Sequence, residues 1–318
     1  MWSRAAKFWP FRSSKAFQLD ADQSRAARAS LSCNGAWEPC VAYKNILVHV
    51  DNTPAGKTRI AAAVALAKKF NSGLSGVFLR SELIENPAIG DGVAPSSATV
   101  AAYLSERNEE ITNEMCAARR IFDEAVREAG VPFWWLDING DSSDAIIACA
   151  RRHDLVVLPS EMRPALGRHV TAAADVGMAS GGPTLVLKHG GFPMAIGRKI
   201  LIAWKDSRES ARALRDAWPF LTQAEEIHFL VVSKHGESEL DDLLQRHLYV
   251  HGCKEAKLTV DRDDEMPVGD IIRRHVGMTG ADLVVLGLYG HSRLREIALG
   301  GVSRDLLSDV PMPLLLSH

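Results

Sequence analysis

The chain has 318 residues, 47% of them hydrophobic and 24% charged, with a formal net charge of −2 and a pI near 6.6. These values are typical of globular proteins of about two domains, and they give no electrostatic basis for a nucleic-acid surface. No apolar run approaches the roughly 18 residues that cross a bilayer. We therefore expect neither nucleic acid nor a membrane as a partner.

The cysteines and histidines do not indicate a metal site or a disulfide framework. The five cysteines are scattered, odd in number and without CxxC spacing, which fits a reducing cytoplasm. His247 and His251 stand at i and i+4 and could share a helix face, but no acidic or cysteine partner follows at metal-site spacing. We expect a cytoplasmic protein with no metal ligands among these residues.

Residues 1–42 differ from the rest of the chain, because they are basic, rich in serine and alanine, and poor in patterned apolar residues. They lack the continuous apolar stretch of a secretory signal. The sequence therefore predicts a basic, disordered extension ahead of the folded chain.

From Tyr43 onward, apolar strands alternate with helical patterns, which predicts parallel strands, right-handed crossovers and a doubly wound α/β domain over residues 43–190. Asp51-Asn52-Thr53 follows the first strand and is suited to capping the next helix. After the first strand, at 44–50, strands are predicted at Gly73–Leu79, Phe133–Ile138, Leu155–Pro159 and Thr184–Lys188. Helices are predicted at Thr58–Phe70, Ala101–Ala129, Ser143–Arg152 and Val170–Ser180.

The same pattern runs again over residues 197–318, after a linker near 189–193. Three segments recur in order and at similar spacing: the strand at 44–50 at 198–204, Asp154–Leu158 at Asp282–Leu286, and Pro183–Leu187 at Pro313–Leu316. The sequence predicts a tandem duplication, with a shorter loop and helix after the second strand of the second copy. The final strands of the two copies could pair within one chain, and we expect an intramolecular pseudo-dimer that could also form a homodimer.

A glycine-rich stretch follows the buried strand predicted at Leu283–Gly287. Gly290 comes next, and Gly300 and Gly301 then open a helical pattern. Glycines allow backbone N–H groups to approach an anion, and a helix N-terminus supplies further donors, so this layout could hold a phosphate. Glycines also end strands and begin helices for structural reasons alone.

These residues resemble the universal stress protein family over 43–318, as two tandem domains. Nucleotide-binding members of that family carry G-x2-G-x9-G-[ST] after the fourth strand. Gly287, Gly290 and Gly300 fall at these spacings, and Gly301 takes the last place. The resemblance implies a Rossmann-type, adenine nucleotide α-hydrolase-like sandwich and an adenine-nucleotide site, usually for ATP with or without Mg²⁺. Doubly wound sheets bind ligands at the carboxyl ends of their strands.

The resemblance places one nucleotide site, in the second domain. The family's aspartate at the end of the first strand corresponds to Asp51 in the first domain and to Lys205 in the second, where Asp206 is displaced by one residue. Lys205 could meet a phosphate as a point charge, or it could be a solvated loop lysine. The first domain has Pro159 and Glu161 in place of the glycine loop, which removes an N–H donor and repels phosphate.

The resemblance also implies a role for each residue of the second-domain site. Backbone N–H groups of Gly290, Gly300 and Gly301 would hold the phosphates, with help from Ser303 or His291. The adenine would lie against the end of the second strand, near Val232. Gly301 in place of a hydroxyl residue removes one hydrogen bond, worth about 0.5–1.5 kcal/mol.

Three functions follow from this interpretation. The first is a stress-response regulator that binds an adenine nucleotide and is not a turnover enzyme. The second is a stress-response scaffold that binds no nucleotide and acts through protein contacts. The third, a slow ATPase or adenylyl transferase, is disfavoured because HxGH and SGGxDS motifs are absent and no general base is evident beside His291 and Ser292. We favour the first, with no catalytic residues.

Overall fold

The computed structural model describes residues 42–80, 97–139, 143–160, 172–188, 195–233, 242–253, 256–263, 265–288, 301–308 and 312–318. All of these belong to one compact unit, Trp37–His318. The extension predicted over 1–42 lies outside the described residues apart from Ala42. The predicted division into domains at 43–190 and 197–318 remains a prediction.

Strands and helices alternate along the described chain. The strands are β1 (Asn45–His49), β2 (Gly73–Arg80), β3 (Phe133–Asn139), β4 (Leu155–Pro159), β5 (Thr184–Leu187), β6 (Lys199–Ala203), β7 (Glu226–Val232), β8 (Lys257–Asp261), β9 (Leu283–Gly287) and β10 (Leu314–Ser317). The helices are α2 (Pro54–Phe70), α3 (Ser97–Ala129), α4 (Ser143–Ala150), α5 (Ala172–Ala179), α6 (Arg208–Asp216), α7 (Trp218–Leu221), α8 (Asp242–Val250), α9 (Val268–Thr279) and α10 (Gly301–Ser308). Within the described ranges, no helix is both long and apolar enough to cross a membrane.

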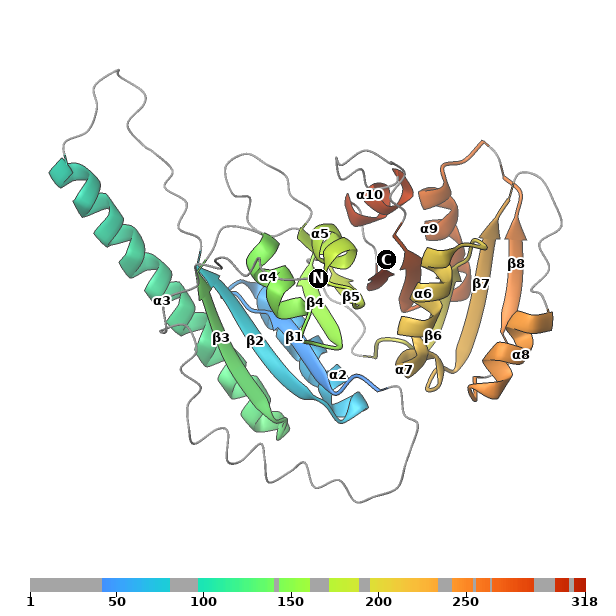
Figure 1. Ribbon diagram of the computed structural model, residues 1–318, viewed down its shortest axis with the longest axis horizontal. Helices are drawn as coiled ribbons and strands as arrows, with labels where there is room; N and C mark the ends of the chain where they lie inside the picture. The colour runs from blue at the N-terminus through green and yellow to red at the C-terminus, as the bar shows by residue number, and fades with distance from the viewer. Residues whose placement is uncertain are drawn as a thin grey trace, which may run out of the picture. The chain divides into compact units, whose positions relative to one another are not determined.

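The described strands form one sheet of ten strands, in the order β3-β2-β1-β4-β5-β10-β9-β6-β7-β8 (Figure 1). We call β1–β5 with their helices the first half and β6–β10 with theirs the second half. Each half has the same strand order, and all pairs within a half are parallel. This confirms the predicted α/β fold with parallel sheets.

The two halves join through their last strands. β5 and β10 pair antiparallel, with Leu314 opposite Val186 and Leu316 opposite Thr184. The predicted pairing of Pro183–Leu187 with Pro313–Leu316 within the chain is therefore confirmed. A further homodimer remains a prediction.

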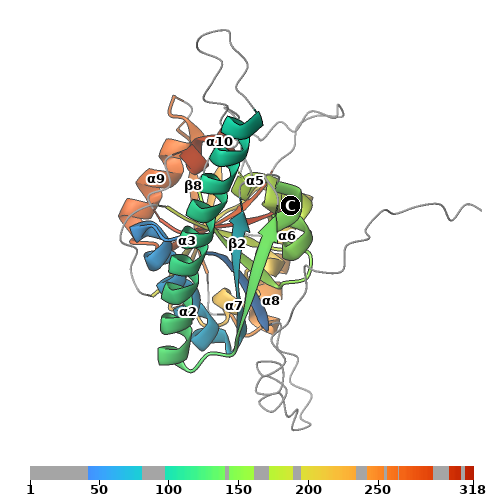
Figure 2. The same cartoon turned by 90° about the vertical axis from the view of Figure 1, so that its left-hand side faces the viewer.

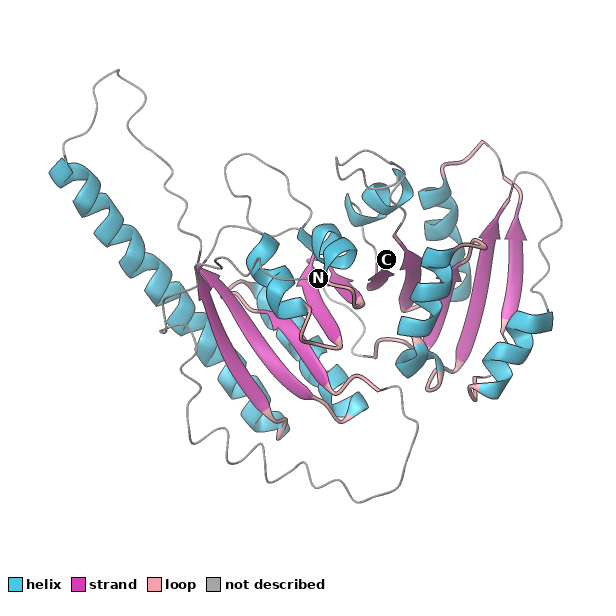
Figure 3. Cartoon of the chain, viewed as in Figure 1, coloured by secondary structure: helices cyan, strands magenta, loops and turns pink. Residues whose placement is uncertain are grey.

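Helices cover both faces of the sheet (Figure 3), which explains the continuous apolar strands. Every residue of β4 and of β9 is buried. One core cluster lies beneath α2, α3, α6, α7 and α8, and the other beneath α4, α5, α9 and α10. In Figure 2 the long helix α3 faces the viewer beside β2, and its 33 residues contrast with the 9 of α8.

The repeated aspartate of the two halves has a structural reason. Oδ2 of Asp154 accepts a hydrogen bond of 2.9 Å from the backbone N–H of Asn45. Oδ1 of Asp282 accepts one of 2.9 Å from the backbone N–H of Arg198. Each carboxylate crosses from the start of the fourth strand of its half to the start of the first strand, and so fixes the central strand pair.

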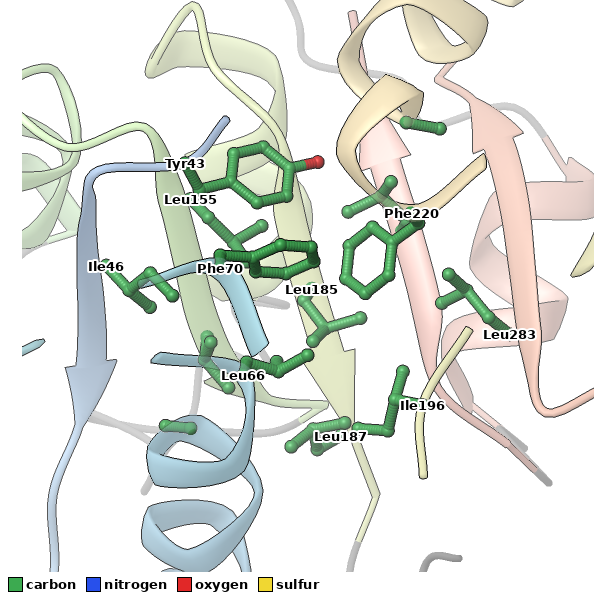
Figure 4. Close-up of a cluster of buried hydrophobic side chains, with 14 of the residues drawn as sticks. Tyr43, Ile46, Leu66, Phe70, Leu155, Leu185, Leu187, Ile196, Phe220 and Leu283 are labelled. Carbon is green, nitrogen blue, oxygen red and sulfur yellow. The ribbon is translucent and has the colours of Figure 1, made fainter. Parts of the chain in front are cut away.

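An aromatic cluster fills the junction between the halves on the α2 face. Tyr43, Phe70 and Phe220 point toward one another (Figure 4), with ring centroids 5.0–5.7 Å apart and edge-to-face geometry. The Tyr43 hydroxyl donates to the backbone carbonyl of Asp216 in the second half. The junction is therefore a packed core as well as a strand pair.

Candidate functional site

The carboxyl ends of β1 and β6 are equivalent places in the two halves. Ile46 of β1 and Ile200 of β6 hold matching positions in the register with β4 and β9. The same number of residues onward leads to Asp51 in one half and to Lys205 in the other. Each position is followed by a serine or threonine whose side chain caps the next helix. The sequence comparison of Asp51 with Lys205 therefore compares equivalent positions of the fold.

In the first half, Asp51 is held by a buried arginine. Arg59 of α2 is 3% exposed, and its Nη2 lies 2.5 Å from Oδ2 of Asp51. Its Nε donates to the carbonyl oxygen of His49 over 2.7 Å. The other carboxylate oxygen of Asp51 accepts from the backbone N–H of Thr53 over 2.9 Å and from the Thr53 hydroxyl. Both oxygens of Asp51 are thus engaged within the protein.

The charges of this cluster balance at neutral pH. Burial, with the Arg59 guanidinium nearby, lowers the pKa of His49 to about 3, so its imidazole is neutral. Burial alone would raise the pKa of Asp51, but Arg59 and the hydrogen bonds from Thr53 outweigh it and hold that pKa below 3.8. One cation and one anion remain, and they face each other. The sequence analysis assigned no role to His49 or Arg59.

The His49 environment predicts that acid destabilises the fold. Unfolded His49 takes up a proton near pH 6.5, whereas the folded residue does so only near pH 3. The unfolded state therefore binds more protons between these values, and stability falls as the pH falls, by at most about 1.4 kcal/mol per pH unit for this group. The depressed pKa of Asp51 adds to the loss below 3.8.

Urea unfolding of the wild type and of His49→Gln at several pH values measures this effect. The difference in unfolding free energy between the two proteins is expected to shrink from neutral pH to about pH 4.5. A difference that stays constant over this range would show that folding does not suppress protonation of His49.

In the second half, the equivalent position carries a base instead of an acid. The backbone N–H of Lys205 donates to Oγ of Ser210 over 3.3 Å at the start of α6. Ala213, 1% exposed, takes the place of Arg59 on the helix that follows. The neighbouring Asp206 is exposed. This half therefore has neither the buried arginine nor the buried carboxylate of the first half.

Gly287, the first glycine of the predicted motif, has a packing role. It ends β9 directly against the first turn of α6. A Cβ atom built on it would lie 2.7 Å from the carbonyl carbon of Glu209 and 2.8 Å from the backbone nitrogen of Ser210. Only a residue without a side chain allows this approach, whatever ligand the site holds.

Replacing Gly287 by alanine is expected to destabilise the protein by about 1–3 kcal/mol, because backbone atoms of α6 would have to shift. Gly277 in α9 is a matched control, since a Cβ there meets nothing within 4 Å. Gly277→Ala should be neutral or stabilising by up to about 1 kcal/mol. Urea unfolding of both variants decides, and equal stability of the two would contradict the packing role.

The other predicted site residues are described only in part. Gly290, His291 and Gly300 lie outside the described residues. Gly301 begins α10, and Ser303 in its first turn is 2% exposed. Val232 is the last residue of β7 and packs partly buried against the core beneath α9 and α10. The structure thus places Gly287 and Gly301 at the two ends of the connection between a buried strand and a helix, as the sequence predicts.

A cluster that the sequence analysis missed lies at the end of β8. Oδ2 of Asp261 lies 2.6 Å from Nε2 of His275 and 2.6 Å from Nη2 of Arg274, both on α9. The hydrogen bond with His275 and the pairing with Arg274 lower the pKa of Asp261 to about 2. The cluster ties α9 to the edge of the sheet, and its carboxylate is engaged.

A groove of about 310 Å³ lies elsewhere, at the amino ends of the strands. Its lining comes from α2 and from the segments that lead into β6 and β7: Ala62, Ala65, Leu66, Lys69, Ala195, Ile196, Arg198, Gln223 and Glu225. It lies at the opposite edge from Lys205 and Gly287, and so it is not the predicted nucleotide site.

The donor set at the strand ends does not fit a divalent cation. Mg²⁺ prefers carboxylate and carbonyl oxygens, but Asp51 is paired with Arg59, and a lysine stands at the equivalent place in the second half. The described residues contain no group of three or more His, Cys, Asp or Glu that could hold a metal. A lysine and glycine N–H groups fit an anion instead.

Solved structures share this fold. A universal stress protein from Archaeoglobus fulgidus DSM 4304 is 16% identical and matches with a TM-score of 0.64, covering 86% of this chain and 97% of its own. A candidate universal stress protein from Pseudomonas aeruginosa UCBPP-PA14 is 17% identical, with a TM-score of 0.54, and covers 87% of this chain and 93% of its own.

No family model matches the sequence, and neither does any curated protein. The similarity therefore rests on structure. It extends over both halves of the chain, because each of the two solved chains aligns over most of its length. The protein has the fold of the universal stress proteins.

Proposed function

We propose that this chain is a tandem universal stress protein that binds one adenine nucleotide, ATP, in its second half and acts as a stress-response regulator. The observation that carries the proposal is the position of the glycine motif. Its first glycine ends the buried parallel strand β9, and α10 begins directly after its last. A helix start behind a parallel strand is where doubly wound sheets bind phosphate.

The difference between the halves supports a single site. In the first half, the Arg59 guanidinium already neutralises Asp51. In the second half, Ala213 stands where that arginine would be, and Lys205 adds a positive charge at the strand end. An anionic ligand is therefore favoured in the second half alone.

A regulatory role is supported by the state of the acids at this edge. Asp51, Asp261 and Asp305 are each paired with a basic side chain, namely Arg59, Arg274 and Arg273. A general base must be available to take up a proton, and these carboxylates are already engaged. Phosphate release with Mg²⁺ should stay at background, and a faster rate that is lost in Gly290→Pro would favour an ATPase.

Calorimetric titration of the full chain with ATP tests the proposal. We expect one nucleotide per chain with a dissociation constant on the order of micromolar. The double variant Gly290→Asp, Gly300→Asp should lose binding, because it places two anionic side chains at the phosphates. Gly167→Asp adds a charge to the corresponding connection of the first half and should bind normally. Two nucleotides per chain would contradict the single site, and no binding up to millimolar ATP would favour the scaffold.

The same titration with EDTA tests the role of Lys205. Because a lysine replaces the metal-binding acid, the affinity for ATP should change little when Mg²⁺ is removed. Lys205→Asp should instead weaken binding in EDTA and recover part of it with Mg²⁺. A wild-type protein that binds only with Mg²⁺ would contradict this part of the proposal.

A further inference from the structure

The residue after Gly287 is fixed by the end of the chain. Leu288 is fully buried, and its backbone N–H donates to the carbonyl oxygen of Ser317 over 2.7 Å. Its own carbonyl oxygen lies 3.0 Å from Nδ1 of His318. Leu288 is the base of the connection from β9 to α10, which we call the glycine connection (residues 289–300). The position of that base therefore depends on β10.

Leu288 also contacts the first half directly. Gly177 lies on α5, and a Cβ atom built on it would come within 2.7 Å of Cδ1 of Leu288. The same Cβ would lie 3.8 Å from Cβ of Leu316, on the strand that pairs with β5. The missing side chain of Gly177 thus makes room for Leu288. A helix of one half is in this way packed against the base of the glycine connection of the other.

We propose that the first half positions the glycine connection of the second half through the contact between Gly177 and Leu288. This inference rests on the proposed function, because it makes Gly177 a positioning residue for ATP, although it lies outside the nucleotide half. Small displacements of binding groups weaken a preorganised site. Because coupling is reciprocal, bound ATP would in turn stabilise the packing of α5 on the second half.

The geometry gives the expected effect of Gly177→Ala. The new methyl group would displace the end of the Leu288 side chain, and the base of the glycine connection would follow. We expect ATP to bind roughly three- to tenfold more weakly, within the usual range of mutations between coupled sites. Gly177→Ala with Leu288→Val conserves volume at the contact and should restore most of the affinity. Gly277→Ala, a helical glycine with open space around it, should leave the affinity unchanged.

Two measurements on the full-length variants test the inference. Calorimetric titration gives the ATP affinity, and hydrogen exchange of the peptide from Val284 to Gly300 reports the connection without ATP. Faster exchange and weaker binding in Gly177→Ala, both reversed by Leu288→Val, would support it. Unchanged exchange in Gly177→Ala would overturn it whether or not ATP binds. Unchanged affinity in a wild type that binds ATP would also overturn it, whereas a wild type that binds no ATP would overturn the proposed function.

Discussion

Replacing Arg59 by alanine is expected to destabilise the protein by about 3–5 kcal/mol, the usual cost of removing one partner from a buried ion pair. The guanidinium is 3% exposed and serves both Asp51 and the backbone carbonyl of His49. Its removal leaves a partly buried carboxylate without its cation and a carbonyl oxygen without this donor. Urea unfolding at neutral pH measures the loss.

Arg80 provides the matched control. It forms a bidentate pair with Asp137, with nitrogen–oxygen distances of 2.7 and 2.6 Å, but both side chains are about one-third exposed. Arg80→Ala should therefore cost no more than about 1 kcal/mol. If Arg59→Ala proved as mild as Arg80→Ala, the cluster around Asp51 would not be a buried structural ion pair, and the argument for a single nucleotide site would weaken.

Replacing Phe220 by alanine is expected to cost about 3–5 kcal/mol and to loosen the junction of the two halves. The ring is fully buried, and its centroid lies 5.0 Å from that of Phe70 and 5.7 Å from that of Tyr43. Because these partners belong to the first half, the cavity would open at the junction. Scanning calorimetry should show unfolding temperatures lowered by on the order of 10 °C and a transition that splits in two.

Phe122 separates this effect from a general loss of stability. It is also fully buried, but it packs within the first half between α3 and β3, close to Phe133 and Trp135. Phe122→Ala should lower the unfolding temperature comparably and should not weaken the junction. Splitting in Phe122→Ala alone, or in neither variant, would show that the Phe220 cluster does not couple the two halves.

The strands and their arrangement follow from the sequence because burial on both faces leaves a plain pattern. The apolar runs at Leu155–Pro159 and Leu283–Gly287 correspond to β4 and β9 without any shift. Helix starts were less accurate. The helix predicted from Thr58 begins at Pro54, since Thr53 caps it and proline is accepted in a first turn.

The contacts that decide the site could not be predicted, because they join residues far apart or hidden in a regular pattern. Arg59 lies within an amphipathic helix, where a charged residue normally faces solvent. Its place beside the apolar Ile60 and Ala63 was the only signal that it is buried. The contact between Gly177 and Leu288 joins two halves whose sequences give no pairing rule. Gly287 was identified as a ligand residue from spacing, but the structure also gives it a packing role.

The most direct test of the central claim is a crystal structure of the full chain with ATP. We predict the nucleotide at the carboxyl ends of β6, β7 and β9, with its phosphates toward Lys205 and the start of α10, and with the Arg59–Asp51 pair intact. A nucleotide bound at the end of β1, with Asp51 released from Arg59, would contradict the account.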